Sequence, residues 1–204
     1  MATATNQGER VDVAFPLAGE SVPLDHGYAL FGALCRVLGD LHGADWLAVH
    51  PVRGMPTSER DLALPPRNHA LRLRVAPTEI TRVLPLAGKS LEVLGSHLRV
   101  GVPSVSALQP SERLYSRCVV IKKFVDEAPF LDAVKRQLAE IEVSATPRLH
   151  RRRVLRIAKY IVVGFGVELS GLSDEDSLVV QRVGIGGRQR FGCGVFIPLA
   201  EAAL

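Results

Sequence analysis

The chain has 204 residues, of which 47% are hydrophobic and 23% charged, with a formal net charge of +4. This hydrophobic content excludes a wholly disordered chain. Apolar runs such as residues 160–163 are far too short to cross a bilayer, and the first ten residues do not resemble a signal peptide. We therefore expect a cytoplasmic protein without membrane contact, built as one large domain or two small ones.

The first half of the chain predicts the element order β-α-β-β-α-β. Alternating or apolar runs indicate strands, and apolar stripes indicate helices. The strands are expected at 11–17, 46–52, 70–75 and 91–100, and the helices at 24–38 and 78–86. Asp25 is placed to cap the first helix and Gly39 to end it. This order is that of a ferredoxin-like domain, which we assign to residues 10–102.

Residues 103–113, with two prolines and several serines, are expected to be a linker. The pattern then restarts. Strands are expected at 115–121, 152–157, 160–169 and 195–197, helices at 130–141 and 173–183, and a tight turn at 158–159. Residues 114–204 are therefore assigned to a second domain. The predicted fold class is α+β, with two tandem ferredoxin-like (RRM-like) domains.

The positive charge is unevenly distributed. Residues 143–204 hold nine Lys and Arg against five Asp and Glu, whereas residues 1–142 hold sixteen of each. The interval between Glu142 and Glu168 contains no acid, and its cations are Arg148, Arg151, Arg152, Arg153, Arg156 and Lys159. Such a cluster indicates a polyanionic partner, and nucleic acid is favoured over a merely solvated positive face.

Residues 184–194, the glycine loop, contain five glycines, two arginines and one phenylalanine. Two interpretations fit this composition: a loop whose exposed N–H groups form a nest for anions, or a long glycine-rich hairpin. Because the loop follows the basic run, we expect it to hold a phosphate backbone. Gly186, Gly187, Arg188 and Arg190 are its predicted contacts.

The three cysteines, Cys35, Cys118 and Cys193, are scattered without a CxxC pair, so they indicate buried small side chains and no zinc site or disulfide framework. No HxH motif, HD doublet or spaced carboxylate cluster indicates a metal site. No metal or cofactor is expected.

With these motifs the chain resembles the RAMP superfamily of CRISPR proteins, which pairs tandem ferredoxin-like domains with a glycine-rich loop in the second. Residues 23–34, 42–51 and 171–177 resemble, in that order, the MYXAN-type branch of CRISPR-associated protein six. The resemblance implies metal-independent cleavage of CRISPR repeat RNA, in which the ribose 2′-OH attacks the adjacent phosphate and leaves a 2′,3′-cyclic phosphate and a 5′-OH. It also implies that the protein keeps the mature crRNA and joins other effector-complex (Cascade) subunits.

The resemblance places a catalytic histidine at or near the first helix, and His26 occupies that position. We expect His26 in the first turn, projecting toward solvent, where it can transfer protons near neutral pH. Tyr28 is expected to position a phosphate oxygen or the hydroxyl. The structural alternatives are a capping histidine and a half-buried tyrosine. His42 is a weaker catalytic candidate, and His50 is expected to be structural.

The basic run from Arg148 to Lys159 is expected to grip an RNA backbone or stem, with His150 touching RNA without doing chemistry. Aromatic residues make up only 5% of the chain, which favours recognition by shape and charge over stacking. Two alternatives stay open: a non-catalytic crRNA-binding RAMP subunit, and a tandem ferredoxin-like protein that binds a small molecule.

Overall fold

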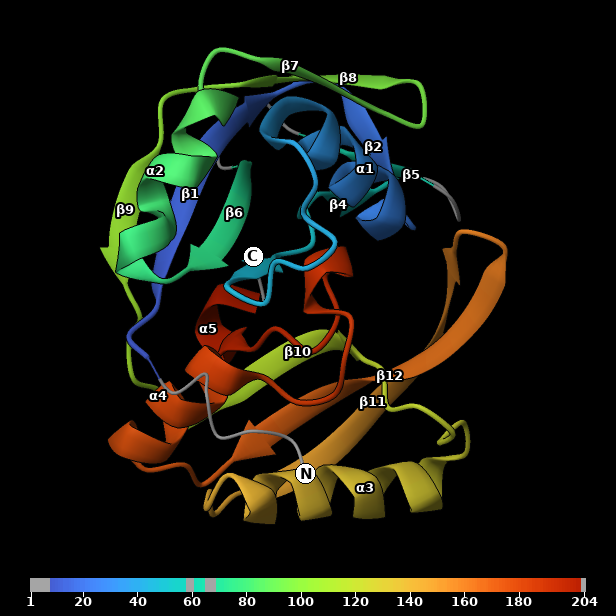
Figure 1. The fold of residues 1–204 in the computed structure, drawn as a ribbon. Coiled ribbons are helices and arrows are strands. Elements are labelled where there is room, and N and C mark those ends of the chain that lie inside the picture. The colour runs from blue at the N-terminus through green and yellow to red at the C-terminus, as the bar shows by residue number, and fades with distance from the viewer. Residues whose placement is uncertain (1–7, 58–60, 65–68, 203–204) are drawn as a thin grey trace. The chain divides into compact units, whose positions relative to one another are not determined.

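The computed structural model describes residues 8–57, 61–64 and 69–202. The chain forms two compact units, Arg10–Ala107 and the residues from Leu108 onward (Figure 1). No described helix is long and apolar enough to cross a membrane.

The N-terminal unit is built on one antiparallel sheet. Its strands are β1 (Val11–Ala18), β3 (Leu47–Val49), β6 (Ala70–Val75), β7 (Ser90–Val93), β8 (Ser96–Val100) and β9 (Ser104–Ala107). The spatial order is β3-β6-β1-β8-β7, and β9 also pairs with β1. The helices are α1 (Gly27–Leu38) and a segment of three short turns: η1 (Pro77–Glu79), α2 (Ile80–Val83) and η2 (Leu84–Leu86). This arrangement confirms the predicted ferredoxin-like order.

Two parts of this unit differ from the prediction. Residues 103–113 are not all linker, because Ser104–Ala107 form β9 and pair with β1 from Val11 to Ala14. A second, small sheet with the order β2-β5-β4 has no counterpart in the prediction. Its strands are only two or three residues long: β2 (Ser21–Pro23), β4 (Met55–Pro56) and β5 (Asp61–Ala63). Such short strands carry too little alternation to be recognised in sequence.

Helix α1 forms from the predicted apolar stripe and buries Leu30, Phe31, Ala33 and Leu34. Gly39 ends it, as predicted, with a φ of 86° that favours glycine. The N-cap position is taken by His26, whose side chain makes no capping hydrogen bond. The expectation that Asp25 takes this position is therefore wrong.

The C-terminal unit repeats the pattern. Its sheet has the order β11-β12-β10-β13, which is the ferredoxin-like order. The elements are β10 (Leu114–Val119), α3 (Glu127–Glu140), β11 (Thr146–Ile157), β12 (Tyr160–Ser170), α4 (Asp174–Val183), η3 (Gln189–Phe191), β13 (Ile197–Pro198) and α5 (Leu199–Ala202). Ser173 caps α4, as predicted, because its Oγ accepts the Asp176 N–H at 3.1 Å.

The core of this unit lies between one face of the sheet and helices α3 and α4. Phe130 of α3 packs on Phe165 of β12 with ring centroids 4.8 Å apart. Buried Val167 and Leu169 of β12 and Val180 of α4 belong to the same cluster. Strands β11 and β12 extend together as a long curved hairpin (Figure 1).

Candidate functional site

The glycine loop is bonded to the protein through its own N–H groups. The N–H of Gly186 donates to Gln137 Oε1 at 2.7 Å, and that of Gly187 donates to the Val120 carbonyl at 2.9 Å. The N–H of Gly194 donates to the Cys118 carbonyl at 2.8 Å. The expectation of a nest of exposed N–H groups is therefore wrong for these three glycines, because a donor already engaged by a protein acceptor is not free for a phosphate.

Close packing explains the glycines. A Cβ on Gly186, whose φ is 77°, would lie 2.5 Å from the Val120 carbonyl oxygen, and a Cβ on Gly194 would overlap the Ile185 carbonyl. Both positions thus require glycine for conformation and for space. Gly187 has no atom within 4 Å of such a Cβ. What the loop offers outward is charge: Arg188 is exposed, with a φ of 68°, and Arg190 is half-buried.

The basic run lies on β11, but its side chains divide between the two faces of the strand. Arg148 pairs with Glu168 and Arg153 with Gly164, whereas Arg152 pairs with Phe165 and Arg156 with Ile161. Phe165 belongs to the core face of the sheet, so Arg152 and Arg156 share that face. Arg148 and Arg153 lie on the opposite face. A bulge between Leu149 and Arg152 breaks the register.

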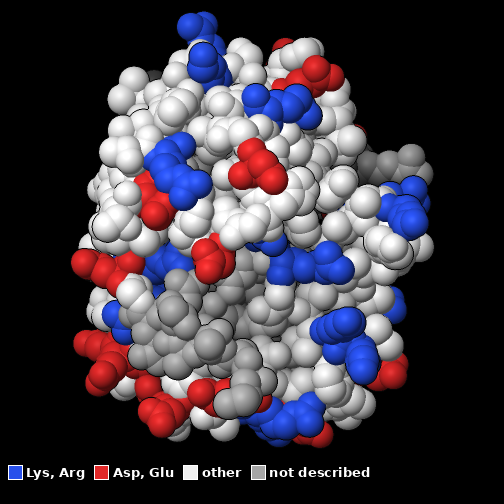
Figure 2. All heavy atoms as spheres, viewed as in Figure 1, with Lys and Arg blue, Asp and Glu red and all other residues white. Residues whose placement is uncertain are grey.

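Both kinds of charge reach the surface of the C-terminal unit. On the face shown in Figure 2, basic side chains lie at the right edge, where the β11–β12 hairpin runs. Acidic side chains gather at the lower left over α4, whose first turn holds Asp174, Glu175 and Asp176. The cations of the hairpin are therefore separated from this acidic group, which suits a polyanion that follows the hairpin.

His150 is held by a carboxylate on the sheet. Its Nε2 lies 2.9 Å from Glu168 Oε2, and its ring meets that of Tyr115 edge-on with centroids 5.5 Å apart. Arg113 donates to Glu168 Oε1 from Nη2 at 2.5 Å and from Nε at 3.1 Å. These hydrogen bonds, those from Arg113 foremost, hold the pKa of Glu168 below its usual value. A charged Glu168 therefore orients His150.

His26 is buried, with 2% of its surface exposed. Its Nδ1 lies 2.7 Å from the Pro23 carbonyl, and its Nε2 accepts the Val52 N–H at 2.9 Å. The ring is thus a neutral tautomer with a proton on Nδ1 and both nitrogens bonded to backbone. The expectation that His26 projects toward solvent is wrong. Its predicted catalytic role stays a prediction, and this geometry favours a structural role.

His42 has the exposure that His26 lacks, with 74% of its side chain accessible. Its Nδ1 lies 2.6 Å from Asp40 Oδ1, which also accepts the His42 backbone N–H at 2.9 Å. The ring meets Phe31 of α1 edge-on with centroids 5.5 Å apart. A carboxylate at Nδ1 and an aromatic edge therefore fix both the tautomer and the direction of this imidazole.

Tyr28 lies in the first turn of α1 and is 42% exposed. It precedes Phe31 by three residues, so the two side chains share one face of the helix. Of the two candidates, His42 has a direct ring contact with Phe31, and Tyr28 lies one turn before Phe31 on the same helix.

A buried ionic group lies on β1 and β6. Asp12 and Arg74 face each other across these strands, and Arg74 donates from Nε to Oδ1 at 2.8 Å and from Nη2 to Oδ2 at 3.0 Å. His50 Nε2 lies 3.3 Å from Asp12 Oδ1. Burial outweighs the attraction of Asp12 and lowers the pKa of His50 to about 4. His50 is therefore neutral and structural, as predicted.

Among the residues that the structure describes, no three His, Cys, Asp or Glu side chains gather as a metal site. Cys118 and Cys193 are buried free thiols in one small apolar cluster, as expected, and Cys35 is half-buried.

Comparison with known structures defines the class. The protein shares its fold with a Cas6-related protein from Pyrococcus furiosus (TM-score 0.64, 13% identity, 93% of this chain and 97% of that one). It also shares it with Cse3 from Thermus thermophilus, solved with an RNA representing a pre-cleavage complex (TM-score 0.51, 14% identity, 92% and 98%). Both matches span the two ferredoxin-like units and place the chain in the class of tandem ferredoxin-like proteins.

The family follows from sequence. The Cas6 Crispr family model matches residues 11–201. The CRISPR-associated endonuclease Cas6 of Myxococcus xanthus (strain DK1622) is 44% identical over 193 residues, covering 95% of this chain and 83% of the relative. The chain belongs to the Cas6 family, which confirms the resemblance seen in its motifs.

Proposed function

We propose that this protein is a metal-independent endoribonuclease that cuts CRISPR repeat RNA, with His42 as the proton-transfer residue. Membership of the Cas6 family and 44% identity to a protein named as an endonuclease support the activity. The observation that carries the assignment to His42 is its exposed ring with Nδ1 2.6 Å from Asp40.

The chemistry needs one group to take a proton from the 2′-OH and another to give one to the leaving 5′-oxygen. An imidazole can fill either role near neutral pH. Donation from Nδ1 to Asp40 puts the lone pair on Nε2, and the carboxylate stabilises the cation formed when Nε2 takes a proton. The nucleophile belongs to the RNA, so a metal-activated water is not needed.

Tyr28 is the second residue of this proposal. Its phenol can donate to a phosphate oxygen as negative charge develops there, which stabilises the transition state. The first turn of α1 is also a favourable place for negative charge, since unbonded backbone N–H groups point out of a helix N-terminus.

His26 takes a positioning role in this proposal. Its ring joins the chain before α1, at Pro23, to the chain after β3, at Val52. It thereby fixes the start of the helix that carries Tyr28. Tyr28 and His42 are the candidate groups of the N-terminal unit whose exposure lets RNA reach them.

Binding is proposed to come from the β11–β12 hairpin. Exposed Arg148, Arg151 and Arg152 and the exposed turn residue Lys159 supply charge to an RNA stem, and His150 supplies a hydrogen-bonding edge beside them. Arg188 and Arg190 of the glycine loop contact the RNA with their guanidinium groups in this proposal. Gly186 and Gly187 act by holding the loop in place.

Cleavage of repeat RNA in EDTA tests this function. The expected products carry a 2′,3′-cyclic phosphate and a 5′-OH, and a 2′-deoxy substitution at the scissile nucleotide should stop cutting. Binding with no cleavage in any buffer would instead support the alternative, a crRNA-binding subunit without catalysis. Absence of RNA binding at physiological salt would support the small-molecule alternative.

We further propose that the protein keeps its product and delivers it to other effector-complex (Cascade) subunits. The hairpin cations reach the stem and not the scissile phosphate alone, so most of the interactions with RNA persist after cutting. Co-elution of the cut stem with the protein in gel filtration tests retention, and free product would contradict it.

A further inference from the structure

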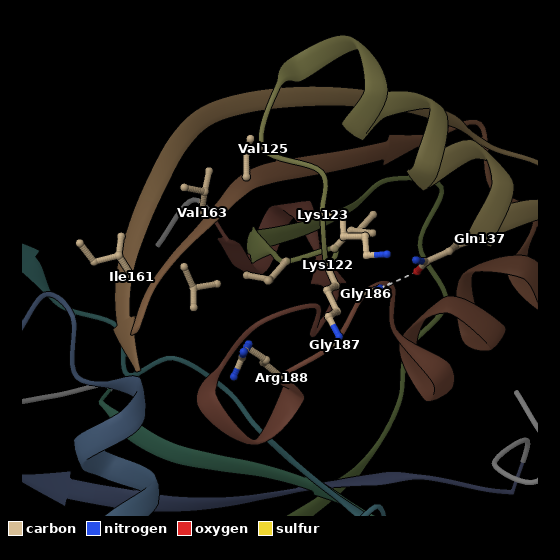
Figure 3. Close-up of a pocket in the computed structure, with 12 residues that line it drawn as sticks. Lys122, Lys123, Val125, Gln137, Ile161, Val163, Gly186, Gly187 and Arg188 are labelled. Atoms are coloured by element: carbon tan, nitrogen blue, oxygen red, sulfur yellow. Dashed lines mark hydrogen bonds between the residues drawn. The ribbon is translucent and has the colours of Figure 1, made fainter. Parts of the chain in front are cut away.

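The C-terminal unit contains an open pocket of about 560 Å³ beside the glycine loop. It is formed by the chain that follows β10, Gln137 of α3, strand β12 and the loop (Figure 3). A volume of this size falls within the range of small-ligand sites. The proposed function assigns no role to this pocket as a whole.

The two sides of the pocket differ in chemistry. Val125, Ile161 and Val163 lie on one side, and Lys122, Lys123 and Arg188 lie on the other (Figure 3). Ile161 is 69% exposed and Val125 48% exposed. No acidic residue lines the pocket among the described residues. The site therefore pairs an exposed apolar wall with an uncompensated cationic one.

The cationic wall carries no counter-charge within the described part of the chain. Across residues 8–57, 61–64 and 69–202, Lys122, Lys123 and Arg188 form no ion pair. A group of positive charges without counter-charges is repulsive by itself and attracts an anion. The pocket is thus suited to a negatively charged ligand.

The backbone holds these cations in place. The Gly187 N–H bonds to the Val120 carbonyl, and the Gly186 N–H bonds to Gln137 Oε1. These bonds join the glycine loop to the chain just after β10 and to α3. Lys123 and Arg188 have φ values of 75° and 68°, a conformation that costs about 1 kcal/mol for a residue with a side chain. Strained positions of this kind concentrate at functional sites.

We propose that this pocket binds one unpaired nucleotide of the repeat RNA next to its stem, with the base on the apolar wall and the phosphates on Lys122, Lys123 and Arg188. A nucleotide has one apolar plane and one anionic edge, which matches the two sides. A paired base is buried in its duplex and cannot enter, so the occupant is unpaired. This inference rests on the proposed function and adds a recognition subsite to it.

The site differs from an aromatic stacking platform. No aromatic residue lines the pocket among the described residues, so the base is held by aliphatic contact and by cations. Gln137 adds a donor for a base edge, because its Oε1 is engaged by Gly186 while its amide lies at the pocket. We expect the pocket to prefer a base over an abasic site more strongly than one base over another.

The test compares repeat RNA with and without unpaired nucleotides on each side of the stem. Wild-type protein should bind RNA with unpaired nucleotides on one side of the stem roughly tenfold more tightly than the stem alone. An abasic substitution at one of these nucleotides should remove most of this preference. The triple variant Lys122→Gln, Lys123→Gln, Arg188→Gln should abolish the preference and lower the salt slope of binding by about 0.7 for each phosphate that it no longer neutralises. Lys135→Gln on α3, outside the pocket, is the matched control.

A second variant tests the apolar wall. Ile161→Ser should abolish the preference for the base without changing the salt slope, since Ile161 is exposed and its replacement leaves the fold intact. Melting temperature reports folding. If both pocket variants bind stem and extended RNA as wild type does, the subsite is overturned while the proposed function stands. If the wild-type protein neither binds nor cuts repeat RNA, the proposed function itself fails.

Discussion

His26 Nε2 accepts a hydrogen bond from the Val52 N–H at 2.9 Å, across 26 residues of chain. Together with the hydrogen bond from Nδ1 to the Pro23 carbonyl, this contact links two separate segments of the N-terminal unit through the buried His26 ring. Because both ring nitrogens are bonded to backbone, His26 can fix the start of α1. The proton transfer that its sequence position also suggests is left to another residue.

Replacing His26 should therefore damage the fold first. His26→Ala leaves the Val52 N–H without a partner and opens a cavity, which should lower the free energy of unfolding by about 1–3 kcal/mol. The rate of cutting per folded molecule should stay within a few-fold of wild type. Urea unfolding and single-turnover cleavage measure the two effects. A variant of wild-type stability that cannot cut would return catalysis to His26.

The glycine loop gives a matched pair of substitutions. Gly186→Ala should destabilise the C-terminal unit by at least about 1–2 kcal/mol, because its φ is 77° and the new Cβ would lie 2.5 Å from the Val120 carbonyl oxygen. Gly187→Ala has open space and should change stability by less than about 0.5 kcal/mol. Thermal unfolding measures both. Equal effects at the two positions would contradict close packing as the reason for the glycines.

Acid should weaken the N-terminal unit through His50. Its pKa is lowered from 6.5 to about 4, so the unfolded chain binds this proton more readily. Stability should therefore fall as the pH drops from about 6.5 to about 4, by about 3 kcal/mol in total. Below this range Asp12 adds a further loss. Burial alone would raise the pKa of Asp12, but His50 and Arg74 hold it well below 3.8.

Urea unfolding between pH 4 and 8 measures this dependence. His50→Gln should flatten the slope above pH 4, and His97→Gln, at an exposed position on β8, is the control that should keep it. A wild-type profile flat from pH 6.5 to 4 would mean that His50 is not buried as a neutral group.

The hairpin cations should determine affinity and not chemistry. The double variant Arg151→Gln, Arg152→Gln should weaken binding of the repeat stem and reduce the salt slope by about 0.9 for each phosphate that it no longer neutralises. Its single-turnover rate at saturating protein should stay unchanged. Arg99→Gln, exposed on β8 of the other unit, is the control. Unchanged affinity in the double variant would mean that the RNA stem does not bind at the β11–β12 hairpin.

Much of the fold follows from local pattern. Both β-α-β-β-α-β orders, the Ser173 cap and the turn at Ala158, whose φ is 53°, are predictable from alternation, caps and turn residues. Alternation predicts that β11 begins at Arg152, but it begins at Thr146, because the polar residues before the bulge hide the pattern. Strand β9 is harder to predict, because it is only four residues long and none of its side chains is buried.

The site is less predictable, since it depends on contacts between distant residues. Nothing near His26 indicates that Pro23 and Val52 enclose it. Glycine density suggests open N–H groups, but Val120 and Gln137 occupy them. Two lysines after a strand, Lys122 and Lys123, look like a solvated turn until the fold brings Arg188 to the same pocket. Asp40, two residues before His42, is the one local signal available for the exposed histidine.

The most direct test of the proposed mechanism is single-turnover cleavage of repeat RNA in EDTA by His42→Ala, beside wild type and Asp40→Asn. His42→Ala should cut about 10²–10⁴-fold more slowly while its melting temperature and RNA affinity match wild type. Asp40→Asn should show a smaller loss, since the imidazole remains while the carboxylate that orients it and stabilises its cation is gone. Cleavage by His42→Ala at the wild-type rate would contradict the proposal that His42 transfers the proton.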